Sequence, residues 1–308
     1  MKRILTLTMN PTIDLSVQVD RIVANQKLRC ESPRYDPGGG GINVSRVIRE
    51  LGGESTALYP CGGSTGKMLS KLLDREGIHH HPVRIKEWTR ENFTANEKKS
   101  QQQYRFNMPG PVLSKKEWNK CLEDIASFQP SPDYIIASGS LPPEIPDDFY
   151  HRVAEIAQNI DSRFILDSSG NPLKKALDTG VFLVKPNIRE FRQLFPDRSD
   201  QEIRVEDQGQ EIISEKKAEI LVVSLGSGGV IYVIKDRCEH IRSPEVPIKS
   251  RIGAGDSMVA GLVLALAREK KLDESVRFGV AAGAAAVMTP GTELCRKKDV
   301  MRIFSSMK

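Results

Sequence analysis

The sequence contains no long hydrophobic run. No apolar stretch approaches the ~20 residues that a membrane-spanning helix needs, and the longest one, residues 258–267, is typical of a buried helix. The N-terminus begins like a signal peptide, but threonines interrupt it and Asn10-Pro11 follows without a small-residue cleavage site. It predicts a first strand instead, so we expect a cytoplasmic protein with no membrane partner.

Cysteine is scarce, and charge is not clustered. The five cysteines lie far apart and form no C-x-x-C pair, which argues against a disulfide framework or a zinc site. The net charge is +5, but Lys and Arg are scattered, so the sequence offers no stripe for nucleic acid. The mild positive excess suits anionic small substrates. With 308 residues, we expect two domains or one large α/β domain with an appendage.

Short apolar runs followed by helical patterns recur along the chain. The strand-like runs are residues 4–8, 56–59, 134–137, 164–166, 182–184 and 220–224. A typical helical pattern, residues 43–51, is amphipathic and stops at Gly52-Gly53, which is a C-cap signal. This alternation predicts an α/β fold with a mostly parallel sheet and helices on both faces.

Two stretches, residues 14–34 and 79–108, break this alternation. The first has apolar residues at period two and no helix of its own. The second has strand-like runs at 82–85, 92–97 and 103–108, the last two joined by a polar turn as a hairpin. They predict a small β-sheet whose apolar face is exposed unless it closes on the main domain as a lid or pairs with a second copy.

The strongest motif is Gly253-Ala254-Gly255-Asp256, which opens a long apolar helix. Glycines let the backbone approach an anion closely, and a helix N-terminus offers free N–H groups and partial positive charge. A carboxylate at that place repels phosphate, so its presence suggests a function. Accepting the proton of an attacking hydroxyl is such a function. The alternative is an ordinary helix start with an acidic first turn.

Three further clusters resemble ligand turns. Gly38 to Gly41 precede Asn43 at another helix start, and the cluster fits neither a Walker loop nor a dinucleotide fingerprint. Lys185-Pro186-Asn187 ends a strand, and Asn187 and Glu190 share one helical face, an arrangement that suits either magnesium or a plain capping box. Residues 224–229 follow a strand and host a nucleotide phosphate or form a tight turn.

Together these motifs resemble the ribokinase-like carbohydrate kinase family, also called the PfkB family, over essentially the whole chain. Gly253 to Asp256 is similar to the family's C-terminal signature, and Gly38 to Asn43 to its N-terminal one. Other matching stretches are residues 27–30, 88–90, 104–110, 138–143, 167–170 and 277–283. The resemblance implies a single ribokinase-like α/β domain over residues 1–308, with 14–34 and 79–108 as lid segments inserted in it.

The resemblance also implies a role for each matching position. Asp256 would be the catalytic base, with Gly253, Ala254 and Gly255 as the anion hole. The implied substrate-binding residues are Asp14, Lys27, Arg29, Gly38, Gly39, Asn43, Arg90, Arg105 and Ser138. The implied ATP-binding residues are Lys185, Asn187, Ser224, Gly226 and Gly229. Asn187 and Glu190 would hold Mg²⁺, through water.

On this resemblance we expect ATP-dependent phosphorylation of a sugar phosphate by a homodimer that docks through the lid. Fructose 6-phosphate is the preferred substrate; fructose 1-phosphate and tagatose 6-phosphate are alternatives, and a non-catalytic sugar-phosphate sensor is a rival of another class. Two positions depart from the pattern. Residues 250–252 lack the Asp that often helps to bind a monovalent cation, which speaks against potassium, and Glu293 stands where the phosphofructokinase-like branch tends to have Arg.

Overall fold

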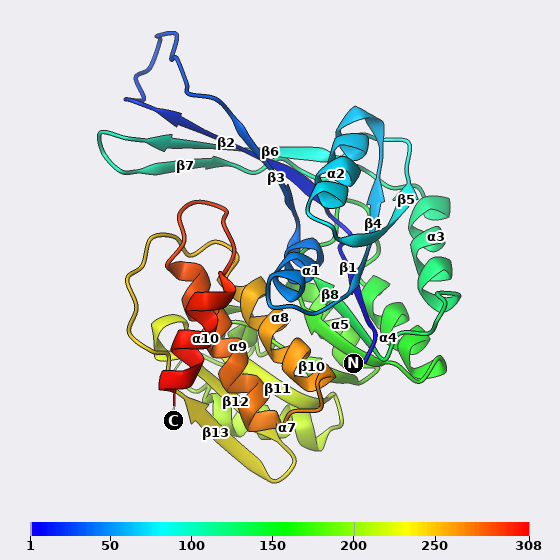
Figure 1. Ribbon diagram of the computed structural model, residues 1–308. Helices are drawn as coiled ribbons and strands as arrows, with labels where there is room; N and C mark the ends of the chain where they lie inside the picture. Colours follow the sequence, from blue (N-terminus) through cyan, green and yellow to red (C-terminus); the bar gives the residue numbers. More distant parts are fainter. Residues whose placement is uncertain (1, 200, 308) are drawn as a thin grey trace.

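A large sheet forms the centre of the molecule (Figure 1). The computed structural model describes residues 2–199 and 201–307. Within them, nine strands follow the order β13-β12-β11-β10-β9-β8-β1-β4-β5. The pairs β11–β12 and β12–β13 are antiparallel, and the other pairs are parallel. Their bounds are β1 Ile4–Leu7, β4 Thr56–Cys61, β5 His79–Arg84, β8 Tyr134–Ser138, β9 Arg163–Asp167, β10 Val181–Val184, β11 Ala218–Ser224, β12 Val230–Ile234 and β13 Arg237–Ile241. The predicted parallel sheet is confirmed.

Helices cover both faces of this sheet because neighbouring strand residues point in opposite directions. Ile135 packs on one face with the helices α3, α4, α5 and α7, whereas Ile136 packs on the other with α1, α8, α9 and α10. The helices are α1 Gly40–Glu50, α2 Gly63–Arg75, α3 Lys115–Ala126, α4 Phe149–Asn159, α5 Gly170–Leu177, α6 Ile188–Arg192, α7 Val205–Ser214, α8 Ala254–Ala267, α9 Leu272–Val287 and α10 Lys297–Ser306. The result is the three-layered α/β/α architecture expected of such a pattern.

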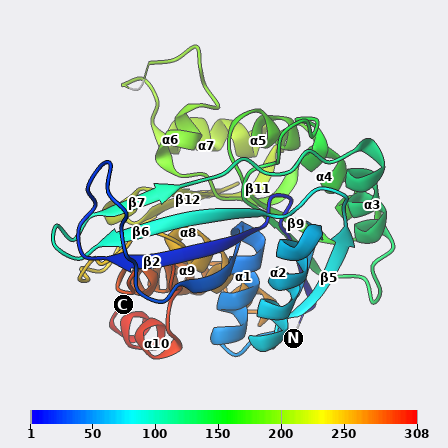
Figure 2. The ribbon, with the colours of Figure 1, turned by 90° about the horizontal axis from the view of Figure 1, so that it is seen from above.

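A second sheet projects from the body (Figure 1). In the described chain it has the order β3-β2-β6-β7, with β2 Thr12–Val19, β3 Arg34–Gly38, β6 Arg90–Glu97 and β7 Gln103–Phe106. The predicted hairpin is confirmed, since Phe93 of β6 faces Phe106 of β7. Seen from above, these strands cross over the part of the body that holds α8 and α9 (Figure 2). We call this sheet the lid.

The assignment of residues 79–108 to the lid is wrong at its beginning. Residues 79–84 form β5, which pairs in parallel with β4 and is the edge strand of the large sheet. The β4–α2–β5 succession simply continues the strand–helix alternation. Three consecutive histidines made this strand hard to recognise from the sequence, because an edge strand is partly exposed and tolerates polar residues. Likewise residues 20–33 contain no strand of the lid, although Cys30 makes an isolated bridge to Val19.

Two local features complete the comparison with the sequence. The capping box at Ser114 is present, with Glu117 as its reciprocal partner. The antiparallel hairpin β12–β13 was not predicted, because β13 carries Arg237 and Glu239 and lacks an apolar alternation. Within residues 2–199 and 201–307, no helix is both long and apolar enough to cross a membrane.

Candidate active site

The candidate site lies where four central strands end. Ser138 and Asp167 are the last residues of β8 and β9, Lys185 follows β10, and Ser224 ends β11. In an open α/β sheet, ligands bind outside the carboxyl ends of the strands. The first turn of α8 points at the same edge and brings Asp256 to it. The fold therefore gathers residues from distant parts of the chain on one side of the sheet.

Asp256 is held by two side chains that lie far from it in the sequence, Asn43 of α1 and Ser138 of β8. Its Oδ2 accepts a hydrogen bond from Asn43 Nδ2 at 2.9 Å, and its Oδ1 lies 3.2 Å from the hydroxyl of Ser138. Burial raises the pKa of Asp256 to about 6, and the negative charge of Asp167 acts in the same direction. Its carboxylate is therefore a much better proton acceptor than an ordinary aspartate at neutral pH.

Asp167 is a member of this site to which we gave no role from the sequence. It forms a buried ion pair with Lys185, whose Nζ lies 3.0 Å from Oδ1 and whose side chain is 5% exposed. Burial alone would lower the pKa of Lys185, but the pairing with Asp167 outweighs it and raises the pKa. A usable signal was present, because Asp167 ends a strand at the edge where the other site residues gather.

The turn of residues 253–256 at the start of α8 has room for an anion. Gly253 precedes α8 with a φ of 70°, a left-handed conformation that favours glycine. The first N–H groups of a helix have no carbonyl partner within it, so those of α8 face the site. A Cβ on Gly255 would lie 3.8 Å from Lys185 Nζ. Glycine thus keeps the space between this turn and the buried ammonium group free of side chains.

The glycine cluster at the start of α1 joins two parts of the site. A Cβ on Gly40 would come within 2.3 Å of Ser138 Oγ, and one on Gly38 would come within 2.3 Å of Asp14 Oδ2. Gly39 has a φ of 109° and packs on Thr8, so the turn itself requires it. The cluster is therefore a turn at which backbone and side chains approach closely. It places Asn43 beside Asp256, and it keeps Asp14 of β2 close to β3.

At the base of the lid, cations surround Asp14. Asp14 accepts a hydrogen bond from Asn92 Nδ2 at 3.0 Å; burial raises its pKa, while Asn92, Arg105 and Arg90 oppose that rise. Arg90 donates to the carbonyls of Asn10 and Met108, but its buried Nε has no hydrogen-bond partner among the described residues. Burial lowers the pKa of Arg90, and its Nε–H remains an unused hydrogen-bond donor beside Asp14.

Lys27 and Arg29 are not part of this cluster. Arg29 precedes Cys30, which pairs with Val19 at the far end of β2, five residues from Asp14. A strand rises about 3.3 Å per residue, so the lid tip lies roughly 16 Å from Asp14 along the strand. Within one chain, the structure therefore corrects the expectation that these two cations join Arg90 around one phosphate.

The residues expected at the nucleotide lie side by side. Asn187 and Ser224 form an isolated parallel bridge, and Ser224 N donates to Pro186 O at 3.0 Å. Gly226 has a φ of 64°, and a Cβ on it would meet no described atom within 4 Å, which leaves room for a ligand. A Cβ on Gly229 would come within 2.1 Å of Ile241 O, so packing against β13 explains that glycine.

Asn187 and Glu190 form a complete capping box. Asn187 Oδ1 accepts the backbone N–H groups of Arg189 and Glu190, and Glu190 Oε2 accepts the backbone N–H of Asn187 at 2.8 Å. The two lone pairs of Asn187 Oδ1 are thus used within the helix start. No cluster of three His, Cys, Asp or Glu suited to a metal ion occurs in the described part of the chain.

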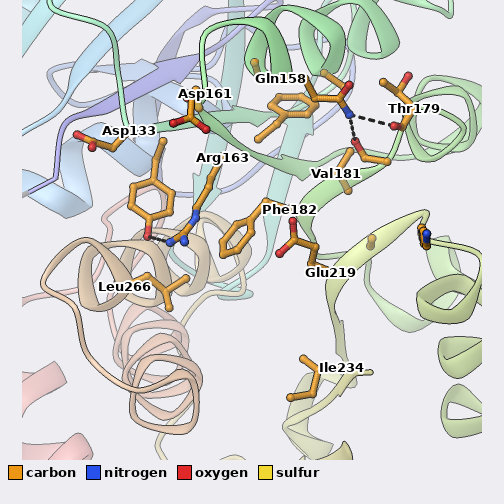
Figure 3. Close-up of a pocket in the computed structure, with 18 of the residues that line it drawn as sticks. Asp133, Gln158, Asp161, Arg163, Thr179, Val181, Phe182, Glu219, Ile234 and Leu266 are labelled. Atoms are coloured by element: carbon orange, nitrogen blue, oxygen red, sulfur yellow. Dashed lines mark hydrogen bonds between the residues drawn. The ribbon is translucent and has the colours of Figure 1, made fainter. Parts of the chain in front are cut away.

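A separate hollow lies at the opposite ends of these strands (Figure 3). It is an open groove of about 1340 Å³ bordered by Tyr134, Arg163, Val181 and Ala218, the first residues of β8 to β11. Arg163 lies over the ring of Phe182, with 4.8 Å between guanidinium carbon and ring centroid. Because it borders the amino ends of the strands, this groove is distinct from the edge that holds Asp256.

Comparisons with known proteins identify the family and the fold. The model of the pfkB family of carbohydrate kinases matches residues 7–299. The ATP-dependent 6-phosphofructokinase isozyme 2 of Mycobacterium tuberculosis is 44% identical over 98% of this chain and 89% of its own length. The isozyme of Escherichia coli is 42% identical over 99% of both chains. Crystal structures of the latter with potassium and with fructose 6-phosphate superpose with TM-scores of 0.93 and 0.91 at 40% identity, covering 100% of this chain and 99% of theirs.

Proposed function

The chain belongs to the pfkB family of carbohydrate kinases, and we propose that it transfers the γ-phosphoryl group of ATP to fructose 6-phosphate, forming fructose 1,6-bisphosphate. The observation that carries this proposal is the position of Asp256. A carboxylate with a pKa of about 6 stands in the first turn of α8, beside helix N–H groups that favour a phosphoryl group. That combination suits proton removal from a hydroxyl that attacks phosphorus.

The reaction is an in-line displacement. The sugar hydroxyl oxygen forms a bond to the γ-phosphorus while the bond from phosphorus to the bridging oxygen breaks and ADP leaves. The hydroxyl proton passes to Asp256. Asn43 and Ser138 keep the carboxylate in place through the hydrogen bonds already described. The N–H groups of the Gly253–Asp256 turn stabilise the charge on the phosphoryl oxygens in transit.

The phosphate already on the sugar would be bound at the base of the lid. Arg90 offers an unpartnered Nε there, and Arg105 is close enough to oppose the rise in the pKa of Asp14. Guanidinium groups bind phosphate oxygens in pairs, while Asp14 and Asn43 can accept and donate hydrogen bonds to sugar hydroxyls. Gly38 lies against Asp14, and Ser138 lies against Gly40 of the same glycine cluster, so both could border the sugar.

A divalent cation, which we propose to be Mg²⁺, suits the nucleotide side. Burial raises the pKa of Glu190, and the negative charge of Asp167 adds to the rise, so a cation between these two carboxylates would be favourable. Asp167 and Glu190 would hold the ion through water and the ATP phosphates; Asn187 Oδ1 is committed to its cap. When bound, the ion neutralises charge on the phosphates. Lys185, Ser224 and Gly226 would contact the nucleotide.

The lid offers a surface for a second copy of the chain. Its apolar side chains Tyr35, Tyr104, Phe106 and Met108 are exposed, and Phe106 is 51% exposed. Since the tip residues Lys27 and Arg29 lie far from their own Asp14, a role for them at a sugar phosphate requires the site of another chain. We therefore propose a homodimer joined through the lid. Light scattering over a dilution series tests it, and a fully active monomer would contradict it.

Potassium is a separate question. The missing Asp before the signature speaks against a monovalent cation, whereas the E. coli relative has been crystallised with potassium. From the sequence potassium is a possible but doubtful cofactor, and we propose that turnover depends little on it. Turnover in KCl compared with tetramethylammonium chloride at equal ionic strength decides it, and a several-fold activation by KCl would reject the prediction.

The activity is tested by measuring ADP release with a panel of sugars. Fructose 6-phosphate should give the highest kcat/KM. A higher value for fructose 1-phosphate or tagatose 6-phosphate would transfer the assignment to those alternatives, and preference for free fructose would reject a sugar-phosphate kinase altogether. A non-catalytic sensor would bind fructose 6-phosphate by calorimetry and release no ADP.

A further inference from the structure

A polar cluster ties the lid to the segment that follows α9. In β3, Arg34 Nε lies 2.9 Å from Asp36 Oδ2, and Arg34 Nη1 lies 2.9 Å from Glu293 Oε1. Asp36 Oδ2 also accepts a hydrogen bond from the hydroxyl of Thr292 at 3.1 Å. Two residues of the lid thus bind two consecutive residues of one turn. We call Arg34, Asp36, Thr292 and Glu293 the clasp.

The turn on the body side is fixed to the catalytic turn. Ser250 Oγ donates to Gly291 O at 2.8 Å, and Thr289 Oγ1 donates to Glu293 O at 2.7 Å. A Cβ on Gly253 would come within 2.6 Å of Leu294 Cδ2, so Leu294 packs directly on the residue that begins the Gly253–Asp256 turn. In Figure 1, the orange-red connection between α9 and α10 rises toward the lid. The clasp therefore joins the lid to a rigid support beside Asp256.

On the lid side, the clasp lies next to the substrate residues. Asp36 faces Asp14 in the register of β2 and β3, and β3 leads directly into the glycine turn that carries Asn43 toward Asp256. Asp36 is 5% exposed, which makes it costly to leave without its partners. Glu293 binds Arg296 as well as Arg34, so its carboxylate is held from both sides.

We propose that Arg34 and Glu293 are positioning residues that hold Asp14 and Arg90 of the lid at the distance from Asp256 that a sugar phosphate requires. This inference rests on the proposed function. It also gives a role to Glu293, the position at which the sequence departs from the phosphofructokinase-like pattern. Because the turn keeps its own bonds to residues 250–253, releasing the lid leaves the nucleotide side intact. The sugar side alone should lose preorganisation.

The test is a double-mutant cycle with Arg34→Gln, Glu293→Gln and the double variant. Each single change should raise KM for fructose 6-phosphate by about two- to fivefold, the value of one partly exposed ion pair, while KM for ATP stays within a factor of two. The double variant should be no worse than the poorer single variant, and Arg34→Lys should fall between wild type and Arg34→Gln, because it keeps the charge but not the two-nitrogen contact with Asp36 and Glu293. Arg198→Gln, which removes a similarly exposed pair with Glu211 far from the lid, is the matched control.

Additive effects in the cycle, an unchanged KM for the sugar, or equal losses for sugar and ATP would each overturn the proposal. Amide hydrogen exchange of residues 34–38 without substrate gives a second reading, and Arg34→Gln should accelerate it relative to Arg198→Gln. If the wild type fails to turn over fructose 6-phosphate, the proposed function is wrong, but the exchange still decides the clasp. Unchanged exchange in Arg34→Gln would then reject it.

Discussion

The catalytic edge of the sheet and the lid satisfy their charged groups in opposite ways. At the edge, Asp167 pairs with Lys185, and Asp256 is held by Asn43 and Ser138. In the lid, Arg90 keeps an unpartnered nitrogen and the side chain of Phe106 faces solvent. At the edge, each of these charged groups has a partner within one chain, whereas the lid leaves contacts open for the sugar phosphate and the second copy that we propose. The site therefore combines a preorganised half at the carboxyl ends of the strands with a half in the lid that ligand binding would complete.

The largest effect should come from the half of the site that lies at the carboxyl ends of the strands. Asp256→Asn keeps the shape of the side chain and removes the base, so kcat should fall by about 10²–10⁴-fold. The dissociation constant for fructose 6-phosphate should change little, because the lid that binds its phosphate is untouched. Single-turnover kinetics and calorimetry check both parts. Turnover near that of the wild type in a folded variant would remove Asp256 from its role as base.

The lid should respond in binding and not in chemistry. Arg90→Ala removes a guanidinium–phosphate contact worth about 1.5–3 kcal/mol and should raise KM for fructose 6-phosphate strongly. Activity on unphosphorylated fructose should hardly change, since that sugar offers no anion. Measuring kcat/KM for both sugars shows whether Arg90 recognises the phosphate or only supports the lid. An equal loss on both would mean that Arg90 supports the lid through Asn10 and Met108 and does not recognise the phosphate.

Assembly should depend on the lid alone. Phe106→Ala removes an exposed aromatic ring whose burial against a second copy contributes about 1.5–3 kcal/mol. The dissociation constant of the dimer should therefore rise by about tenfold or more in sedimentation velocity. Met301→Ala deletes an apolar side chain of similar exposure on α10 and serves as the control. If both variants behave alike, the lid does not hold the dimer.

The pH dependence of kcat/KM should reflect the pKa of the buried Asp256. Base catalysis needs ionised Asp256, so kcat/KM should fall as the pH drops through about 6, with a tenfold loss for each further pH unit. An exposed aspartate would lose activity only near pH 4. If kcat/KM stays constant down to pH 5, either the charge of the Asp256 carboxylate is not needed or bound ligands lower its pKa.

The smallest effect concerns stability. The pKa of Asp256 is higher in the folded chain than in the unfolded one, so folding becomes less favourable as the pH rises from about 4 to 6. Above that window its ionised form costs at most about 3 kcal/mol. Asp256→Asn should therefore raise the melting temperature of the free protein at pH 7 by a few degrees and leave it nearly unchanged at pH 4. An equal shift at both pH values would point to packing.

Much of the fold could be predicted because its signals are local. Strand–helix alternation, the cap at Ser114 and the hairpin of β6 and β7 each depend on neighbouring residues. The edge strand β5 and the hairpin β12–β13 were missed or misplaced, because polar residues on an edge strand erase the apolar alternation. The choice of sheet for β5 depends on which strand it meets, and no local pattern contains that information.

The turn of residues 253–256 and its carboxylate could be predicted from the sequence, since glycines before a helix and an acid in its first turn act through local backbone geometry. Tertiary structure alone decided what that carboxylate touches. It brought Asp167 and Lys185 beside Asp256, occupied both lone pairs of Asn187 Oδ1 in a cap, and kept Lys27 and Arg29 away from Arg90. Charge and pKa depend on distances between segments far apart in the chain, and only the packed sheet fixes those distances.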